Sequence, residues 1–123
     1  MGTAVLVVTL VAVAANAFSG IAALAHFRPI LPGMARAGVP ESWLTFPIGT
    51  LKTAGAAGLL LGLLGLPLVG TAAAIGLVLF FVCAVHTHLR AGDYSPQFGL
   101  ALGFLGLAVA TLALGLPSTL DGA

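Results

Sequence analysis

The stretch Phe46-Pro-Ile-Gly-Thr-Leu-Lys-Thr-Ala-Gly-Ala-Ala-Gly-Leu-Leu-Leu61 decides how this chain folds. It is apolar almost throughout, and its one charged residue is Lys52. An apolar run of about 20 residues is typical of a helix that crosses a bilayer. An ammonium near the bilayer centre costs at least a few kcal/mol, so such a residue usually faces the interior of a bundle and a partner there. Lys52 is therefore the first candidate functional residue.

The composition excludes several classes of protein. The 123 residues are 60% hydrophobic and 6% charged, whereas soluble domains carry about 25% charged residues. The net charge of +1 excludes the basic footprint of a nucleic-acid-binding protein. A single cysteine, Cys83, cannot form an internal disulfide or a CxxC pair. The chain is therefore not a four-helix thiol oxidoreductase, because those enzymes need paired cysteines.

Four apolar runs lie along the chain, at about 3–25, 43–66, 68–89 and 98–116. Each is near the roughly 20 residues that a helix needs to cross a bilayer. An open sheet edge cannot be satisfied in lipid, and the chain is too short for a closed barrel. The first run lacks a basic leader and is too long for a signal peptide, so we take it as a span. We predict an all-α, integral membrane four-helix transmembrane bundle that forms a single membrane domain, 1–123.

The connections predict an orientation. Residues 26–42 form the longest loop, in which Gly33-Met-Ala-Arg-Ala-Gly38 could form one or two helical turns, and Gly65-Leu-Pro67 is a tight turn. An even number of spans puts both termini on one side. The loops on the other side carry Arg28, Arg36 and Arg90. Because basic residues mark the cytoplasmic side, we predict a multi-pass protein with its termini outside.

Small residues recur at spacings of three or four, which lets helix backbones approach closely in lipid. We expect them to serve packing within the bundle, with a homodimer seam as the alternative. Four thin helices also leave surface for a homo-oligomer or a membrane partner protein. These residues are Gly55, Gly58, Gly62 and Gly65 in the second run, Gly70 and Ala74 in the third, and Gly99, Gly103 and Gly106 in the fourth.

In a regular helix starting near Trp43, Lys52 lies roughly 14 Å along the axis, close to the middle of a hydrocarbon layer of about 30 Å. Its expected partners are the end of the third run and the polar face of the first, where Asn16, Ser19 and Gly20 share one side. Two interpretations stay open. Lys52 is either a structural donor that ties spans together or a pocket residue that binds an anionic headgroup or acts as a base.

The third run ends in Cys83-Ala-Val-His-Thr-His-Leu-Arg90. Cys83, His86, Arg90 and Asp93 fall on one helical stripe. His88 lies about 200° from His86 on a helix of 3.6 residues per turn, so the two histidines cannot share a metal site, and we predict none. Which histidine faces the pocket stays open.

Glu41 begins the second run after Pro40, which suits a helix N-terminus; its functional interpretation is a counter-charge at the mouth of the pocket. The residues singled out divide into two sets. The catalytic candidates are Lys52, His86 and Glu41, and the substrate-binding candidates are Lys52, His88, Arg90, Asn16 and Asp93.

Three segments resemble the DoxX-like family of small four-span bacterial membrane proteins. They are Val39-Pro-Glu-Ser-Trp43, Gly49-Thr-Leu-Lys-Thr-Ala-Gly-Ala-Ala-Gly-Leu-Leu60 and His88-Leu-Arg-Ala-Gly-Asp93. Many members of that family carry a glutamate where Lys52 stands, which reverses the charge. The resemblance implies a bacterial inner (cytoplasmic) membrane location and a link to quinone-coupled sulfur oxidation and redox-associated complexes. More distant relatives resemble receptor-assembly chaperones.

Two hypotheses for function follow. In the first, the bundle binds a lipophilic small molecule, a quinone or an isoprenoid-like metabolite, in a polar pocket, with acid–base or redox-associated chemistry. In the second, it is a non-catalytic accessory or assembly protein of a partner complex. No cofactor is expected apart from a quinone as a candidate, and no nucleic acid; the expected partners are the lipid bilayer and the lipophilic molecule.

Overall fold

The computed structural model describes residues 2–26 and 28–122, and within these residues every regular element is a helix. The prediction of an all-α bundle is confirmed. Long helices alternate with short 3-10 and π-helical segments near one end. The elements are α1 (Thr3–Leu24), η1 (Arg28–Ile30), α2 (Leu31–Ala37), η2 (Glu41–Leu44), η3 (Thr45–Gly49), α3 (Thr50–Leu63), α4 (Pro67–Ala91) and α5 (Pro96–Gly122).

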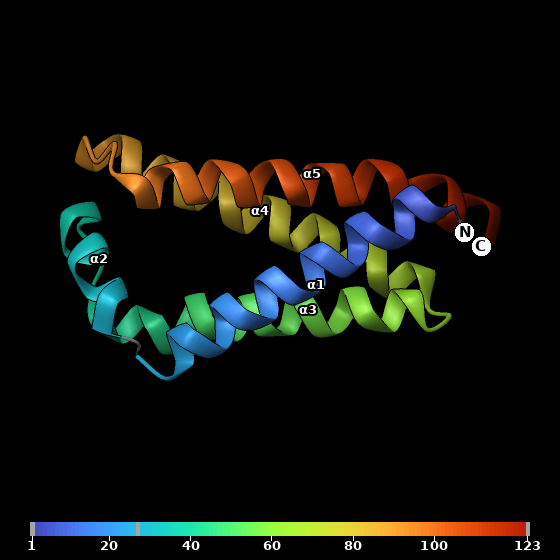
Figure 1. The fold of residues 1–123 in the computed structure, drawn as a ribbon, viewed down its shortest axis with the longest axis horizontal. Helices are drawn as coiled ribbons and strands as arrows, with labels where there is room; N and C mark the ends of the chain where they lie inside the picture. The colour runs from blue at the N-terminus through green and yellow to red at the C-terminus, as the bar shows by residue number, and fades with distance from the viewer. Residues whose placement is uncertain (1, 27, 123) are drawn as a thin grey trace.

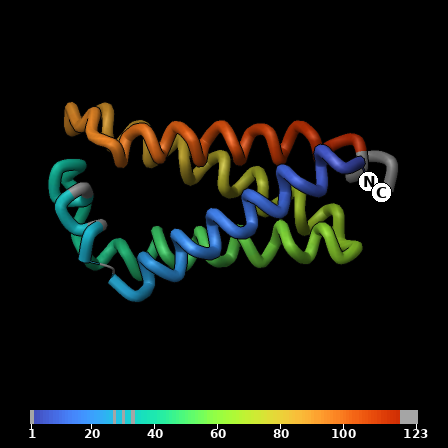
Figure 2. The backbone as a smooth tube through the Cα atoms, in the orientation of Figure 1, coloured from blue at the N-terminus to red at the C-terminus, as the bar shows by residue number. Residues whose placement is uncertain are grey.

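The long helices pack side by side in a ring, in the order α1, α3, α4, α5. In this ring α3 and α5 each contact both α1 and α4. Both termini lie at one end of the bundle together with the α3–α4 turn (Figure 1). The short helix α2 lies across the opposite end, which Figure 2 shows along the backbone trace. The helical turn expected within Gly33–Gly38 is confirmed as part of α2.

Within the described residues, four segments are long and apolar enough to cross a membrane: Thr3–Leu24, Glu41–Leu63, Pro67–Ala91 and Pro96–Pro117. Their outward faces carry large apolar side chains, such as Phe18 and Leu79, that would meet water in a soluble protein. These faces fit a multi-pass membrane protein.

Glycines bring α3 and α4 close together, as the small-residue pattern predicts. A Cβ added at Gly62 would lie 2.7 Å from the Cα of Gly70, and one at Gly58 would lie 2.6 Å from the Cβ of Ala73. The helices join through a turn in which Gly65 has a positive φ of 122°, a conformation that glycine adopts without strain. Pro67 then begins α4, where a missing N–H costs nothing.

The expectation for α5 is wrong. Gly99, Gly103 and Gly106 are exposed, and a Cβ added at any of them would meet nothing within 4 Å. The reason is rotational: α5 turns Ala101, Ala108 and Thr111 toward the bundle, so the glycines lie on its outer face.

The second apolar segment does not begin as a regular helix, which corrects the estimate of depth. Its first residues form the 3-10 turn η2, and Phe46 is extended at φ −142° and ψ 132°. Pro47 disfavours the helical conformation of the residue before it and removes one backbone donor. Regular helix starts only at Thr50, so Lys52 lies in the first turn of α3 and not nine residues into a helix.

Two clusters of buried side chains hold the bundle. The main core joins Ala12, Leu59, Ala74, Leu77, Phe81 and Ala108. A second cluster of Ala23, Met34 and Leu44 fixes α2 against α1 and η2. Between these clusters, near the α2 end, lies Lys52.

Candidate functional site

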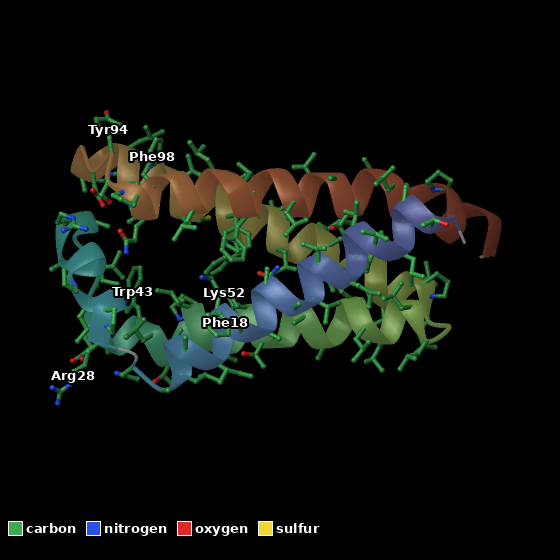
Figure 3. All side chains as sticks on the ribbon, viewed as in Figure 1. Phe18, Arg28, Trp43, Lys52, Tyr94 and Phe98 are labelled. Carbon is green, nitrogen blue, oxygen red and sulfur yellow. The ribbon has the colours of Figure 1, made fainter. Side chains whose placement is uncertain are left out.

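Lys52 points from α3 into the interior of the bundle (Figure 3). Its Nζ donates a hydrogen bond to Ser19 Oγ of α1, at 2.8 Å. The expected partner on the first span is thus confirmed. Among residues 2–26 and 28–122, no carboxylate lies within ion-pair distance of Lys52. Because a lysine ammonium has three N–H donors, two remain for another acceptor.

Three phenylalanine rings surround this ammonium. Nζ lies 5.3 Å from the ring centroid of Phe104, 5.5 Å from that of Phe81 and 5.9 Å from that of Phe80. Phe81 stacks on Phe104 and meets Phe80 edge to face. A cation within about 6 Å of an aromatic centroid is attracted by the ring. The rings therefore stabilise the positive charge without neutralising it.

A cavity of about 200 Å³ lies beside the ammonium. This volume far exceeds the roughly 10–15 Å³ that one water molecule needs. The polar residues on its wall are Ser19, Lys52, His88 and Gln97. The rest of the wall is apolar, formed by Ala23, Leu44, Ile48, Phe80, Phe81, Ala84, Leu100, Ala101 and Phe104. We call this space the inner cavity.

Asp93 orients His88. α4 ends at Ala91, and the capping residue Gly92 has a positive φ of 66° that lets the chain turn sharply. The turn brings Asp93 Oδ2 to 2.9 Å from His88 Nδ1, and Asp93 Oδ1 accepts the backbone N–H of Ser95 at 3.1 Å. The polar groups of Ser95, its hydroxyl first, together with His88, lower the pKa of the Asp93 carboxyl, and burial opposes them. An ionised Asp93 makes Nδ1 the donor and leaves Nε2 available.

Arg36 connects α2 to this cluster. Its Nε lies 3.9 Å from Asp93 Oδ1, and its Nη2 donates to Gln97 Oε1 at 3.5 Å. Gln97 belongs to α5 and lines the inner cavity. These long, partly exposed contacts hold α2 against the end of the bundle that contains the cavity.

The structure brings some of the sequence candidates together. Lys52 and His88 line the same cavity. Asp93 does not line this cavity, but its carboxylate binds His88, which does. Asn16 is buried on α1, where its Nδ2 donates to the Ala12 carbonyl at 2.9 Å; it does not line the inner cavity.

Other candidates lie elsewhere. His86 is exposed, because a helix that turns His88 inward turns His86 about 200° away. Arg90 is exposed near the end of α4. Glu41 lies at the start of η2 with its Oε1 4.0 Å from His26 Nδ1, and its side chain is 60% exposed. None of the three lines the inner cavity.

The phenylalanines and Gln97 were not among the residues predicted from the sequence. A signal for the phenylalanines was present, since a buried cation without an acid needs other shielding, and aromatic faces provide it. The facing spans carry Phe80, Phe81 and Phe104 on the half of each span nearest the polar loops.

A second cavity, of about 380 Å³, lies between the second apolar segment and α4. Most of its wall is apolar. It is lined by Val39, Trp43, Pro47, Ile48, Leu51, Gly76, Leu79, Phe80, Cys83, Ala84, Thr87 and His88. We call this space the lateral cavity.

Comparison with known proteins gives one positive result. The family model of the DoxX-like family matches residues 7–111, so the chain belongs to that family. No curated protein and no solved structure matches the chain. In the part of the chain that the structure describes, no three His, Cys, Asp or Glu side chains come together as a metal-binding group would.

Proposed function

Starting from a DoxX-like protein built of four apolar helices, we propose that it binds the polar end of a lipophilic small molecule in the inner cavity. The observation that carries the proposal is the Lys52 ammonium, which has one hydrogen bond, three aromatic neighbours and a cavity beside it. In this proposal Lys52 lies within the bilayer, where a charge is kept for function more often than for stability.

The wall of the cavity favours an acceptor oxygen on the ligand. The Lys52 ammonium offers charged donors, and hydrogen bonds to ionised groups are roughly twice as strong as neutral ones. A carboxylate, an enolate or a carbonyl oxygen fits these donors, and the apolar wall around them fits a ring or a hydrocarbon chain. Quinones and isoprenoid-like metabolites both have this combination.

His88 adds the chemistry of a proton donor or acceptor. With Nδ1 held by Asp93, Nε2 is free to exchange a proton with the bound headgroup. We assign different roles to the two residues. Lys52 would stabilise the ligand oxygen that becomes negatively charged, and His88 would exchange the proton with the headgroup.

Native mass spectrometry of the protein extracted gently from its own membranes tests the proposal, followed by identification of co-purifying molecules. Wild-type protein should carry one lipophilic small molecule with a carbonyl or acidic oxygen. Lys52→Met, which keeps the length of the side chain and removes its charge, should fold and lose this molecule. The matched control, Arg90→Met, removes an exposed cation outside the cavity and should retain it.

Circular dichroism and gel filtration establish that each variant is folded. If Lys52→Met does not fold, Ser19→Ala is used instead. This variant removes only the hydrogen bond that holds Lys52 Nζ, and it should lower the fraction of protein that carries the ligand. A wild-type protein that carries only bulk phospholipid would contradict the proposal.

The second candidate function is that of an accessory protein of a membrane complex. The outward glycine face of α5, formed by Gly99, Gly103 and Gly106, favours it because such faces allow close helix contact in lipid. Under this hypothesis the extracted protein carries a partner chain and no small molecule, and Lys52→Met leaves that partner bound.

A further inference from the structure

The two cavities share a wall. Ile48, Phe80, Ala84 and His88 line both. Phe80 faces the Lys52 ammonium from one side of this wall and borders the lateral cavity on the other. A side chain that borders both spaces in this way forms part of the partition between them.

The lateral cavity reaches the outer surface of the apolar helices. Trp43, Leu51 and Leu79, all on its wall, are 45%, 41% and 61% exposed. Gly76 is exposed too, and a Cβ added there would meet nothing within 4 Å. In a bilayer these residues face lipid, so the lateral cavity opens toward hydrocarbon.

The two spaces differ in polarity. The inner cavity holds the ammonium of Lys52, whereas the lateral cavity is mainly apolar, with His88 on the shared wall. A hydrocarbon chain gains no hydrophobic free energy on moving from lipid into an apolar pocket, so its affinity for the lateral cavity depends on packing contacts with the wall. The arrangement matches one amphiphile, with its oxygen at Lys52 and its chain in the lateral cavity.

Resting on the proposed function, we propose that the lateral cavity is the subsite for the ligand's hydrocarbon chain, and that the ligand reaches Lys52 sideways from the bilayer, past Phe80. The occupant is a single-chain amphiphile with an acceptor oxygen. The shared wall supports this assignment, because a chain leaving the inner cavity between α3 and α4 passes directly into the lateral one.

Gly76→Leu tests the subsite. The new side chain would occupy part of the lateral cavity, because Gly76 lies on its wall and a Cβ added there meets nothing within 4 Å. Gly106→Leu is the matched control, because it makes the same change at an equally open glycine on the outer face of α5. The probes are hexanoate, which has a short chain, and 9,10-dibromostearate, whose bromine atoms quench tryptophan.

Binding of both probes is measured in phosphatidylcholine nanodiscs by native mass spectrometry. Wild-type protein should bind both, and Lys52→Met neither. Gly76→Leu should bind hexanoate as wild type does and the stearate at least about tenfold more weakly, since the leucine and the long chain would overpack the same space. Gly106→Leu should match wild type for both probes.

Fluorescence gives the position of the chain, because Trp43 is the single tryptophan and lies on the wall of the lateral cavity. Dibromostearate should quench it saturably in wild type, and unlabelled stearate should reverse the quenching. In Lys52→Met only the linear background from probe dissolved in the bilayer should remain.

The outcomes separate the two proposals. If Gly76→Leu binds stearate as tightly as wild type, or if quenching of Trp43 never saturates, the subsite is wrong while Lys52-dependent hexanoate binding leaves the proposed function standing. If hexanoate and stearate bind equally to wild type and Lys52→Met, the proposed function fails, and the subsite fails with it.

Discussion

The Lys52 ammonium is stabilised by the Ser19 hydroxyl and by the three phenylalanine rings around it. Phe104→Leu should remove the nearest ring, 5.3 Å from Nζ, while keeping an apolar side chain. We expect a coupling energy of about 0.5–2 kcal/mol between Lys52 and Phe104. A double-mutant cycle with Lys52→Met, measured by unfolding in mixed micelles, isolates this coupling from the cost of repacking. Additive effects of the two substitutions would show that the rings only fill space.

Asp93 should make the structure sensitive to acid. Its pKa is lowered from 3.8 in the folded protein, so its stabilising contribution is complete above that pH and is lost as the pH falls through the folded-state pKa. The ionisable groups that face it are His88 and the more distant Arg36. Thermal unfolding between pH 7 and pH 3 should show a steeper fall in Tm for wild type than for Asp93→Asn below about pH 4. Parallel curves would exclude this role.

Residue by residue, the sequence was informative about Lys52 and Ser19 because a charge in an apolar run demands a partner. It could not choose between His86 and His88, since a rotation of α4 exchanges them and the helix is apolar on all sides. It could not separate Phe81 from a lipid-facing phenylalanine for the same reason. Arg36 and Asp93 meet only because α2 folds over the end of the bundle, and no local pattern indicates that contact.

Among the helices, the close approach of the α3 and α4 backbones depends on Gly62, which faces the backbone of Gly70. In Gly62→Ala the new methyl would lie 2.7 Å from the Cα of Gly70, so the backbones must separate. Overpacking of this kind destabilises by about 1–3 kcal/mol. Gly103→Ala is the control, because its Cβ meets open space and the better helix propensity of alanine should stabilise by up to about 1 kcal/mol. Unfolding midpoints in detergent give both values, and equal effects would contradict the assigned faces.

Hydropathy locates the apolar segments, and the ends of these segments lie within a few residues of those expected from the sequence. The exception is the helix α5 (Pro96–Gly122), which extends further than expected. The irregular start of the second span is the main difference. Phe46-Pro47 contained the signal, because a residue before proline avoids the helical conformation, but apolar composition outweighed it. The face of α5 could not be predicted because alanines and glycines both satisfy a small-residue pattern.

For the whole molecule, both termini lie at one end and the arginine-containing loops at the other (Figure 1). We predict that the arginine end is cytoplasmic. Alkaline phosphatase fused after residue 116 should therefore be active, and the same enzyme fused after Gly92 should be inactive. Green fluorescent protein at these sites should report the reverse. Phosphatase activity of the fusion after Gly92 would contradict the predicted orientation. The end of the bundle that contains His88 would then lie outside.

The short length of α3 has a consequence for the surrounding lipid. Its 14 residues extend about 21 Å at 1.5 Å each, against a hydrocarbon layer of about 30 Å. The remaining depth meets η2 and η3, where Trp43 and Phe46 are exposed. Local thinning of the bilayer is one way in which a membrane accommodates a helix shorter than its hydrocarbon layer. A thinned leaflet beside α3 would lower headgroups toward Trp43, so the membrane itself would shorten the path of a polar group to the bundle.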